Sequence, residues 1–128
     1  MIFGAIEAGG TKFVLATGTK EENCPFHGTC LEGLASGPAI EGRTKLKGIE
    51  IPEDHESWMY VADYISQAIV NYILVLSPIN IILGGGVMDR KFLYPLIRKN
   101  VKELLNGYIV TEELKDMDNY ITAPSLAG

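Results

Sequence analysis

The most informative segment of this sequence is Pro78-Ile-Asn-Ile-Ile-Leu-Gly-Gly-Gly-Val-Met88. A short apolar run rich in β-branched residues and bounded by Pro and Gly predicts a buried strand. The glycines at its end, Gly84, Gly85 and Gly86, leave backbone that another group can approach closely. Open α/β sheets bind ligands beyond the carboxyl ends of their strands, so this turn could be a binding site. The alternative is that the glycines only make a tight link from strand to helix.

Amphipathic helices are expected on both sides of this strand. The first should run from about Glu56 to Leu76, capped near Asp54, with an apolar face at three- and four-residue spacing made of Trp58, Val61, Ala62, Ile65, Ala68, Ile69, Tyr72, Ile73 and Leu76. The second should span residues 91–106, with Phe92, Leu93, Leu96, Ile97, Val101, Leu104 and Leu105 inward and Gly107 at its end. Since Pro95 lacks an N–H, this helix either starts near Tyr94 or is kinked.

The remaining segments are predicted to be shorter. Ser36-Gly37-Pro38 suits the start of a short helix. The polar residues 45–53, punctuated by Gly and Pro, indicate a surface loop. A charged loop over residues 111–118 should lead into a short strand at about residues 120–123.

Composition indicates an ordinary globular protein. The 128 residues are 47% hydrophobic and 21% charged, and 11 basic against 16 acidic residues give a net charge of −5. No cluster of Lys or Arg suggests a nucleic-acid footprint. The amino end reads as a strand rather than a signal peptide, so we expect a cytoplasmic protein. The apolar residues 61–76 carry Asp63, Gln67 and Asn71 as a polar stripe, so we expect no membrane segment.

A glycine-containing turn stands near the amino end. Residues 2–7 and 13–17 predict two strands joined by Ala8-Gly-Gly-Thr-Lys12. Its glycines could expose backbone N–H groups to a phosphate, while the threonine offers a hydroxyl and the lysine a charge. A plain hairpin turn explains the same residues. The candidate phosphate-binding set is Gly9, Gly10, Thr11 and Lys12.

A possible metal site follows directly. Cys24, His27 and Cys30 place two sulfurs and an imidazole within seven residues, a spacing that can wrap one tetrahedral zinc ion. In this sequence only His55 or a carboxylate could supply a fourth ligand. A disulfide and a pair of unrelated buried thiols are the alternatives, and a cytoplasmic location disfavours the disulfide. Glu32, just after the loop, reads by itself as a surface carboxylate.

Together these segments resemble one family. Ile6-Glu-Ala-Gly-Gly-Thr-Lys-Phe13, the run from Cys24 to Pro38 and Leu83-Gly-Gly-Gly-Val-Met88 are similar, in this order, to bacterial ROK-family fructokinases. The resemblance implies an α/β protein with an actin-like, hexokinase-type (ribonuclease H-like) fold. It also implies transfer of a phosphoryl group from ATP, with Mg²⁺, to D-fructose, giving fructose 6-phosphate. Residues 1–20 would be the phosphate-binding hairpin of the amino-terminal α/β domain, and residues 21–128 the zinc loop and carboxy-terminal α/β domain.

The resemblance also assigns roles. Residues 9–12 match the hairpin that contacts the phosphates, and Glu32 matches an acidic residue that faces sugar hydroxyls. The remaining matches are three of four structural zinc ligands, at Cys24, His27 and Cys30, and the turn beside the adenosine, at Gly84, Gly85, Gly86 and Val87. The implied partners are fructose and ATP, without nucleic acid or membrane, and a homodimer is left open.

One long family segment is absent from this sequence. It carries the catalytic Asp and the upstream histidine that would be the fourth zinc ligand, so no catalytic residue is assigned here. Either the chain is a shortened relative, or the sequence joins separate pieces of a full-length kinase. We expect the second, because a shortened chain would leave sheet edges uncovered. The alternatives are a non-catalytic zinc-binding remnant or pseudokinase, a kinase for another hexose, and a sugar-responsive repressor, for which no amino-terminal DNA-binding module is seen.

Overall fold

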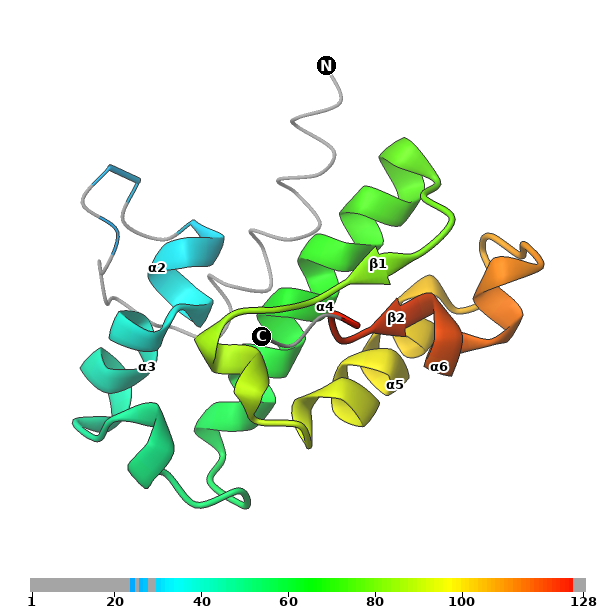
Figure 1. Cartoon of the computed structure of the whole chain (residues 1–128). Coiled ribbons are helices and arrows are strands. Elements are labelled where there is room, and N and C mark those ends of the chain that lie inside the picture. Colours follow the sequence, from blue (N-terminus) through cyan, green and yellow to red (C-terminus); the bar gives the residue numbers. More distant parts are fainter. Residues whose placement is uncertain (1–23, 25, 28–29, 126–128) are drawn as a thin grey trace.

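The computed structural model describes Cys24, Phe26, His27 and residues 30–125. The predicted hairpin with Gly9, Gly10, Thr11 and Lys12 lies outside the described residues. The described part is mostly helical, with one small sheet (Figure 1). Its elements are α2 (Leu31–Ala35), α3 (Gly37–Thr44), η1 (Gly48–Glu50), α4 (Ser57–Leu76), β1 (Ile81–Ile82), η2 (Gly86–Asp89), α5 (Leu93–Leu105), η3 (Glu113–Lys115), α6 (Met117–Tyr120) and β2 (Ile121–Thr122), where η marks 3₁₀ turns.

The long helix α4 confirms the first predicted amphipathic helix, but not its cap. Glu56 occupies the cap position and makes no side-chain cap hydrogen bond, so the expected cap near Asp54 is wrong. Instead the Ser57 backbone N–H donates to His55 Nδ1 at 3.1 Å. A neighbouring imidazole therefore satisfies one of the free donors at this helix start.

The helix α5 resolves the position of Pro95. The helix starts at Leu93, so Pro95 lies in the first turn, where a missing N–H removes no intrahelical bond. It ends at Asn106 in the left-handed conformation, followed by Gly107 with φ of 74°. The predicted glycine end is confirmed.

The short helix α3 is also confirmed. The Ser36 hydroxyl accepts a hydrogen bond from the Ala39 N–H at 3.3 Å, as an N-cap residue does. The expected surface loop at residues 45–53 is only partly right, because it contains η1 and its Ile51 is 2% exposed. The apolar side chain of Ile51 joins the core although its neighbours are polar.

The two strands form a parallel pair, β1 with β2, in the register Ile81 to Ile121 and Ile82 to Thr122. The Leu83 N–H extends the pairing by donating to the Thr122 carbonyl at 2.9 Å. The apolar run between Pro78 and Gly84 was predicted to be a buried strand, but the strand covers only Ile81–Ile82, and Ile82 is 60% exposed. Within the described residues β1 has a single strand neighbour, so its other edge lacks the pairing that would extend and cover it.

The core lies between α4 and α5, with α2 packed on the other side of α4. Trp58 meets Phe92 edge to face at 5.6 Å between ring centroids, and the same core cluster includes the buried Ile69, Ile73, Ile97 and Val101. By length and composition α4 could also cross a membrane. The core helix of a globular protein passes the same test, and α4 has one face packed into the core described here.

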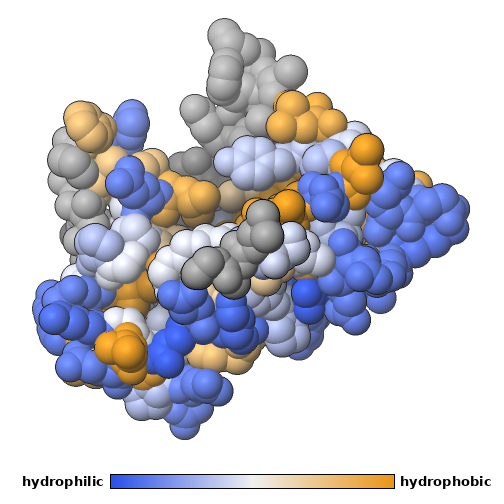
Figure 2. Space-filling model, viewed as in Figure 1, coloured by the Kyte–Doolittle hydropathy of each residue, from blue (hydrophilic) through white to orange (hydrophobic). Residues whose placement is uncertain are grey.

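One end of α4 carries exposed apolar side chains. Tyr72 and Leu76, expected to point inward, are 53% and 69% exposed, whereas Gln67 from the expected polar stripe is buried. Figure 2 shows hydrophobic surface over this end of α4 and β1. The helix periodicity was therefore predicted correctly, but the burial of its last turn was not.

Candidate metal centre and glycine turn

The three predicted metal ligands come together. One ligand atom each from Cys24, His27 and Cys30 lies within 4.8 Å of the others. Ligand atoms around a tetrahedral zinc ion, at metal distances of about 2.0–2.3 Å, are separated by roughly 3.5–3.8 Å. The Cys24 Sγ to His27 Nδ1 distance of 3.9 Å is already close to that value, and both cysteines are free. The donor set and its spacing therefore fit zinc.

The backbone prepares Cys24 for this role. The His27 N–H donates to Cys24 Sγ at 3.4 Å. Hydrogen bonds from the Phe26 and His27 backbone lower the pKa of the Cys24 thiol, because they stabilise its thiolate. The thiolate is the form that binds metals.

Of the two predicted sources of a fourth ligand, His55 and a carboxylate, the structure does not support His55. Among the described residues His55 is not part of the group, and its Nδ1 accepts the Ser57 N–H. Glu32 is exposed in the first turn of α2, and its Oε2 lies 3.8 Å from Cys24 Sγ. The compact group of ligand atoms consists of Cys24, His27 and Cys30, without Glu32. The structure therefore places the predicted sugar-facing carboxylate beside the predicted metal site.

The glycine turn presents open backbone. Gly84, Gly85 and Gly86 are exposed, and an added Cβ at Gly85 or Gly86 would meet nothing within 4 Å. Gly85 has φ of 97° and ψ of 169°, a conformation essentially restricted to glycine. Val87 follows in η2, which leads into α5. The geometry agrees both with a turn that a ligand approaches and with a tight link.

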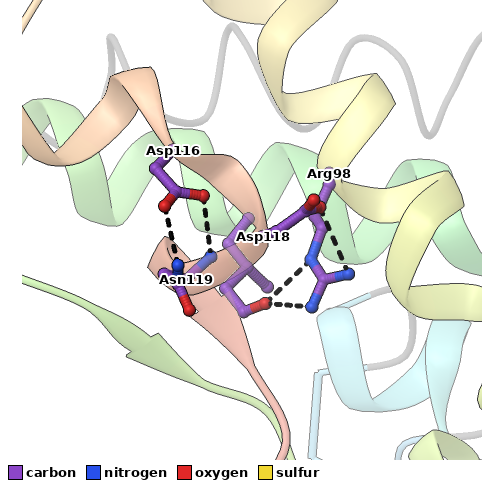
Figure 3. Close-up of polar contacts among 5 residues, drawn as sticks. Arg98, Asp116, Asp118 and Asn119 are labelled. Carbon is purple, nitrogen blue, oxygen red and sulfur yellow. Dashed lines mark hydrogen bonds and ion pairs between the residues drawn. The ribbon is translucent and has the colours of Figure 1, made fainter.

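A cavity of about 690 Å³ in the described part of the chain contains none of the predicted site residues. It lies between α5 and residues 107–118, and its charged lining includes Arg98, Lys102, Lys115 and Asp118. Figure 3 shows Arg98 beside Asp118, and Asp116 facing Asn119. We assign no chemistry to this cavity, because most of these groups already have polar partners.

Two residues that matter near the turn were missed in the sequence. On α5, Tyr94 donates to the carbonyl of Leu83, just after β1, and Arg98 donates to the carbonyl of Ile121 in β2. No sequence motif indicated these two residues. Both lie within an amphipathic helix, and their hydrogen-bond partners are main-chain carbonyls, which every residue has.

Comparison with known proteins decides the family. The ROK family matches residues 18–123. The chain belongs to the ROK family. This ROK chain is 46% identical over 108 residues to the fructokinase of Pediococcus pentosaceus, covering 84% of the chain and 36% of that protein. It is 45% identical over 106 residues to the putative fructokinase of Bacillus subtilis (strain 168), covering 82% and 36%.

A third relative gives the same picture. The fructokinase of Lactococcus lactis subsp. cremoris is 44% identical over 108 residues, covering 84% of the ROK chain and 37% of that protein. The chain thus spans about a third of the length of the curated relatives it matches. The predicted ROK membership is confirmed, whereas the domain boundaries and the roles of individual residues remain predictions.

Proposed function

We propose that the protein carrying this chain is a cytoplasmic, ATP-dependent fructokinase that converts D-fructose to fructose 6-phosphate with Mg²⁺-ATP. Its fold would be the actin-like, hexokinase-type arrangement, of which α5 and the parallel pair β1 and β2 are one β-α-β piece. Membership of the ROK family and the names of the relatives support this proposal.

The proposal depends most on the group of potential metal ligands, Cys24, His27 and Cys30, that lies beside Glu32. Zinc bound by Cys24, His27 and Cys30 would be structural and would fix the loop that leads into α2. Glu32 lies in the first turn of that helix, so the same loop would set the direction of its carboxylate. An ionised carboxylate accepts hydrogen bonds, and sugar hydroxyls donate them.

The nucleotide would lie between two turns. The backbone N–H groups, hydroxyl and charge of residues 9–12 suit phosphates. The turn of Gly84, Gly85 and Gly86 with Val87, whose backbone is open at Gly85 and Gly86, suits ribose and base. Mg²⁺ would supply charge stabilisation at the phosphates. Phosphoryl transfer depends on such positioning and electrostatics, and the group that orients the attacking hydroxyl is assigned to none of these residues.

The test is an assay of ADP formation by the purified protein with fructose, mannose and glucose, combined with its intact mass. We expect fructose to be the preferred substrate. Preference for another sugar would overturn the assignment to fructose. Absence of turnover in a zinc-containing protein with an intact mass of 14.0 kDa would favour the non-catalytic zinc-binding remnant.

A further inference from the structure

A tyrosine of α5 reaches back to the residue before the glycine turn. The Tyr94 hydroxyl donates a hydrogen bond of 2.6 Å to the Leu83 carbonyl oxygen, and Gly84 follows Leu83. Tyr94 is 5% exposed, and burial raises the pKa of its hydroxyl, which therefore keeps its proton at neutral pH. The contact thus joins the first turn of α5 to the end of β1.

The Tyr94 ring is held in place. The Arg98 guanidinium carbon lies 5.7 Å and the Lys91 ammonium 5.6 Å from the ring centroid, distances typical of cation–π contacts. Arg98 is itself fixed by hydrogen bonds to the Ile121 carbonyl. The hydroxyl therefore acts from a fixed position.

The turn itself contains little that could hold it. Its glycines have no side chains to pack, and glycine backbone is the most mobile. The Leu83 N–H donates to Thr122 before the turn, and the Met88 N–H donates to the Gly85 carbonyl within it. On the far side, Arg90 donates to the Ile51 carbonyl at 3.0 Å and lies over Trp58. The Pro124 ring packs against Gly84, whereas Gly85 and Gly86 face open space, so the order of the turn depends on contacts at its two ends.

We propose that the Tyr94 hydroxyl is a positioning group that sets the backbone of Gly84, Gly85 and Gly86 for ligand approach. The expected effect of Tyr94 on nucleotide binding rests on the proposed function. Tyr94 does not touch the ligand in this proposal; it acts through the Leu83 carbonyl.

A second tyrosine, Tyr120, bonds to the segment before β1 and provides a matched control. The Tyr120 hydroxyl donates at 2.9 Å to the Pro78 carbonyl, before the other end of β1. Tyr120 is 3% exposed, and burial raises the pKa of its hydroxyl as well. Tyr120→Phe therefore removes the same kind of bond from the same segment, but away from the glycines.

The test compares Tyr94→Phe and Tyr120→Phe in the full 128-residue chain by NMR. We expect Tyr94→Phe alone to lower the backbone order parameters of residues 84–86, from about 0.85 toward 0.6, and to speed exchange of the Leu83 amide by about tenfold. Equal changes in both variants, or none in Tyr94→Phe, would overturn the proposal. Global unfolding of Tyr94→Phe would also overturn it, because the hydroxyl would then hold the fold rather than the turn.

Calorimetric titration with adenosine supplies a second readout. Tyr94→Phe should weaken adenosine binding about tenfold, with Tyr120→Phe close to the parent chain. If the parent chain binds no adenosine, the nucleotide role proposed for the turn fails, while the NMR comparison still decides whether Tyr94 orders it. If adenosine binds equally to both variants and the parent, the positioning role is wrong.

Discussion

Arg98 on α5 donates two hydrogen bonds, of 2.9 and 2.7 Å, to the carbonyl oxygen of Ile121 on β2 (Figure 3). Ile121 is fully buried, and the Arg98 side chain is 21% exposed. Asp118 contacts the same guanidinium at 3.6 Å but is 87% exposed. The bond to the buried carbonyl should therefore contribute more to stability than the ion pair with Asp118.

Replacing Arg98 should test this difference. Arg98→Met keeps most of the aliphatic stem but leaves the Ile121 carbonyl without its charged donor, so we expect a loss of about 1.5–3 kcal/mol in the free energy of unfolding. Urea denaturation measures it. Asp118→Asn is the matched control and should have a much smaller effect, because water screens that exposed pair. Equal losses in both variants would contradict this ranking.

The conformation of Gly85 predicts a contrast between neighbouring glycines. Gly85→Ala forces a Cβ into a conformation with φ of 97°, which should cost about 1–3 kcal/mol of stability. Gly86→Ala adds a methyl group to open space without a positive φ, so its stability should change by less than about 0.5 kcal/mol. Thermal and urea unfolding of both variants would check this. A stable Gly85→Ala protein would show that the turn adopts another backbone conformation.

The metal site predicts a defined zinc content. After exhaustive dialysis, metal analysis should find about one zinc ion per chain, since the three protein ligands can be completed by one further donor. Cys30→Ser should lose it because a thiolate ligand is removed. His55→Ala is the matched control and should retain it, as His55 lies outside the ligand group. A folded metal-free protein, or a disulfide between Cys24 and Cys30, would contradict the prediction.

The two glycine turns should affect a bound nucleotide differently in the full-length protein. Lys12→Ala should weaken ADP but leave adenosine nearly unchanged, because only the phosphates would meet the lysine charge. Gly85→Val should weaken both ligands by at least ~1 kcal/mol if a contact is lost. Calorimetric titration of each ligand separates these outcomes. Equal weakening of adenosine and ADP by Lys12→Ala, or unchanged binding to folded Gly85→Val, would show that the turns do not share one nucleotide.

Local features of the structure were predictable because neighbouring residues determine them. The helices α4 and α5 follow from apolar spacing, and the Ser36 cap follows from a hydroxyl placed before Gly37 and Pro38. The grouping of Cys24, His27 and Cys30 was predictable for a similar reason, since so few residues separate them that a short loop can bring their ligand atoms together.

Long-range features were not predictable in this way. The length of a strand depends on its partners, and β1 has only β2 beside it in the described part of the chain, which limits it to Ile81 and Ile82. Helix periodicity gives the direction of Tyr72 and Leu76 on α4, but only the packing of other elements decides whether that face is covered.

The family, the two long helices, the glycine turn and the grouping of Cys24, His27 and Cys30 could therefore be predicted from the sequence. The hydrogen bonds from Tyr94 to the Leu83 carbonyl and from Arg98 to the Ile121 carbonyl depend instead on how distant segments pack. A main-chain carbonyl has no sequence signature, because every residue carries one. Which carbonyl a side chain reaches is fixed only when α5 packs beside β1 and β2.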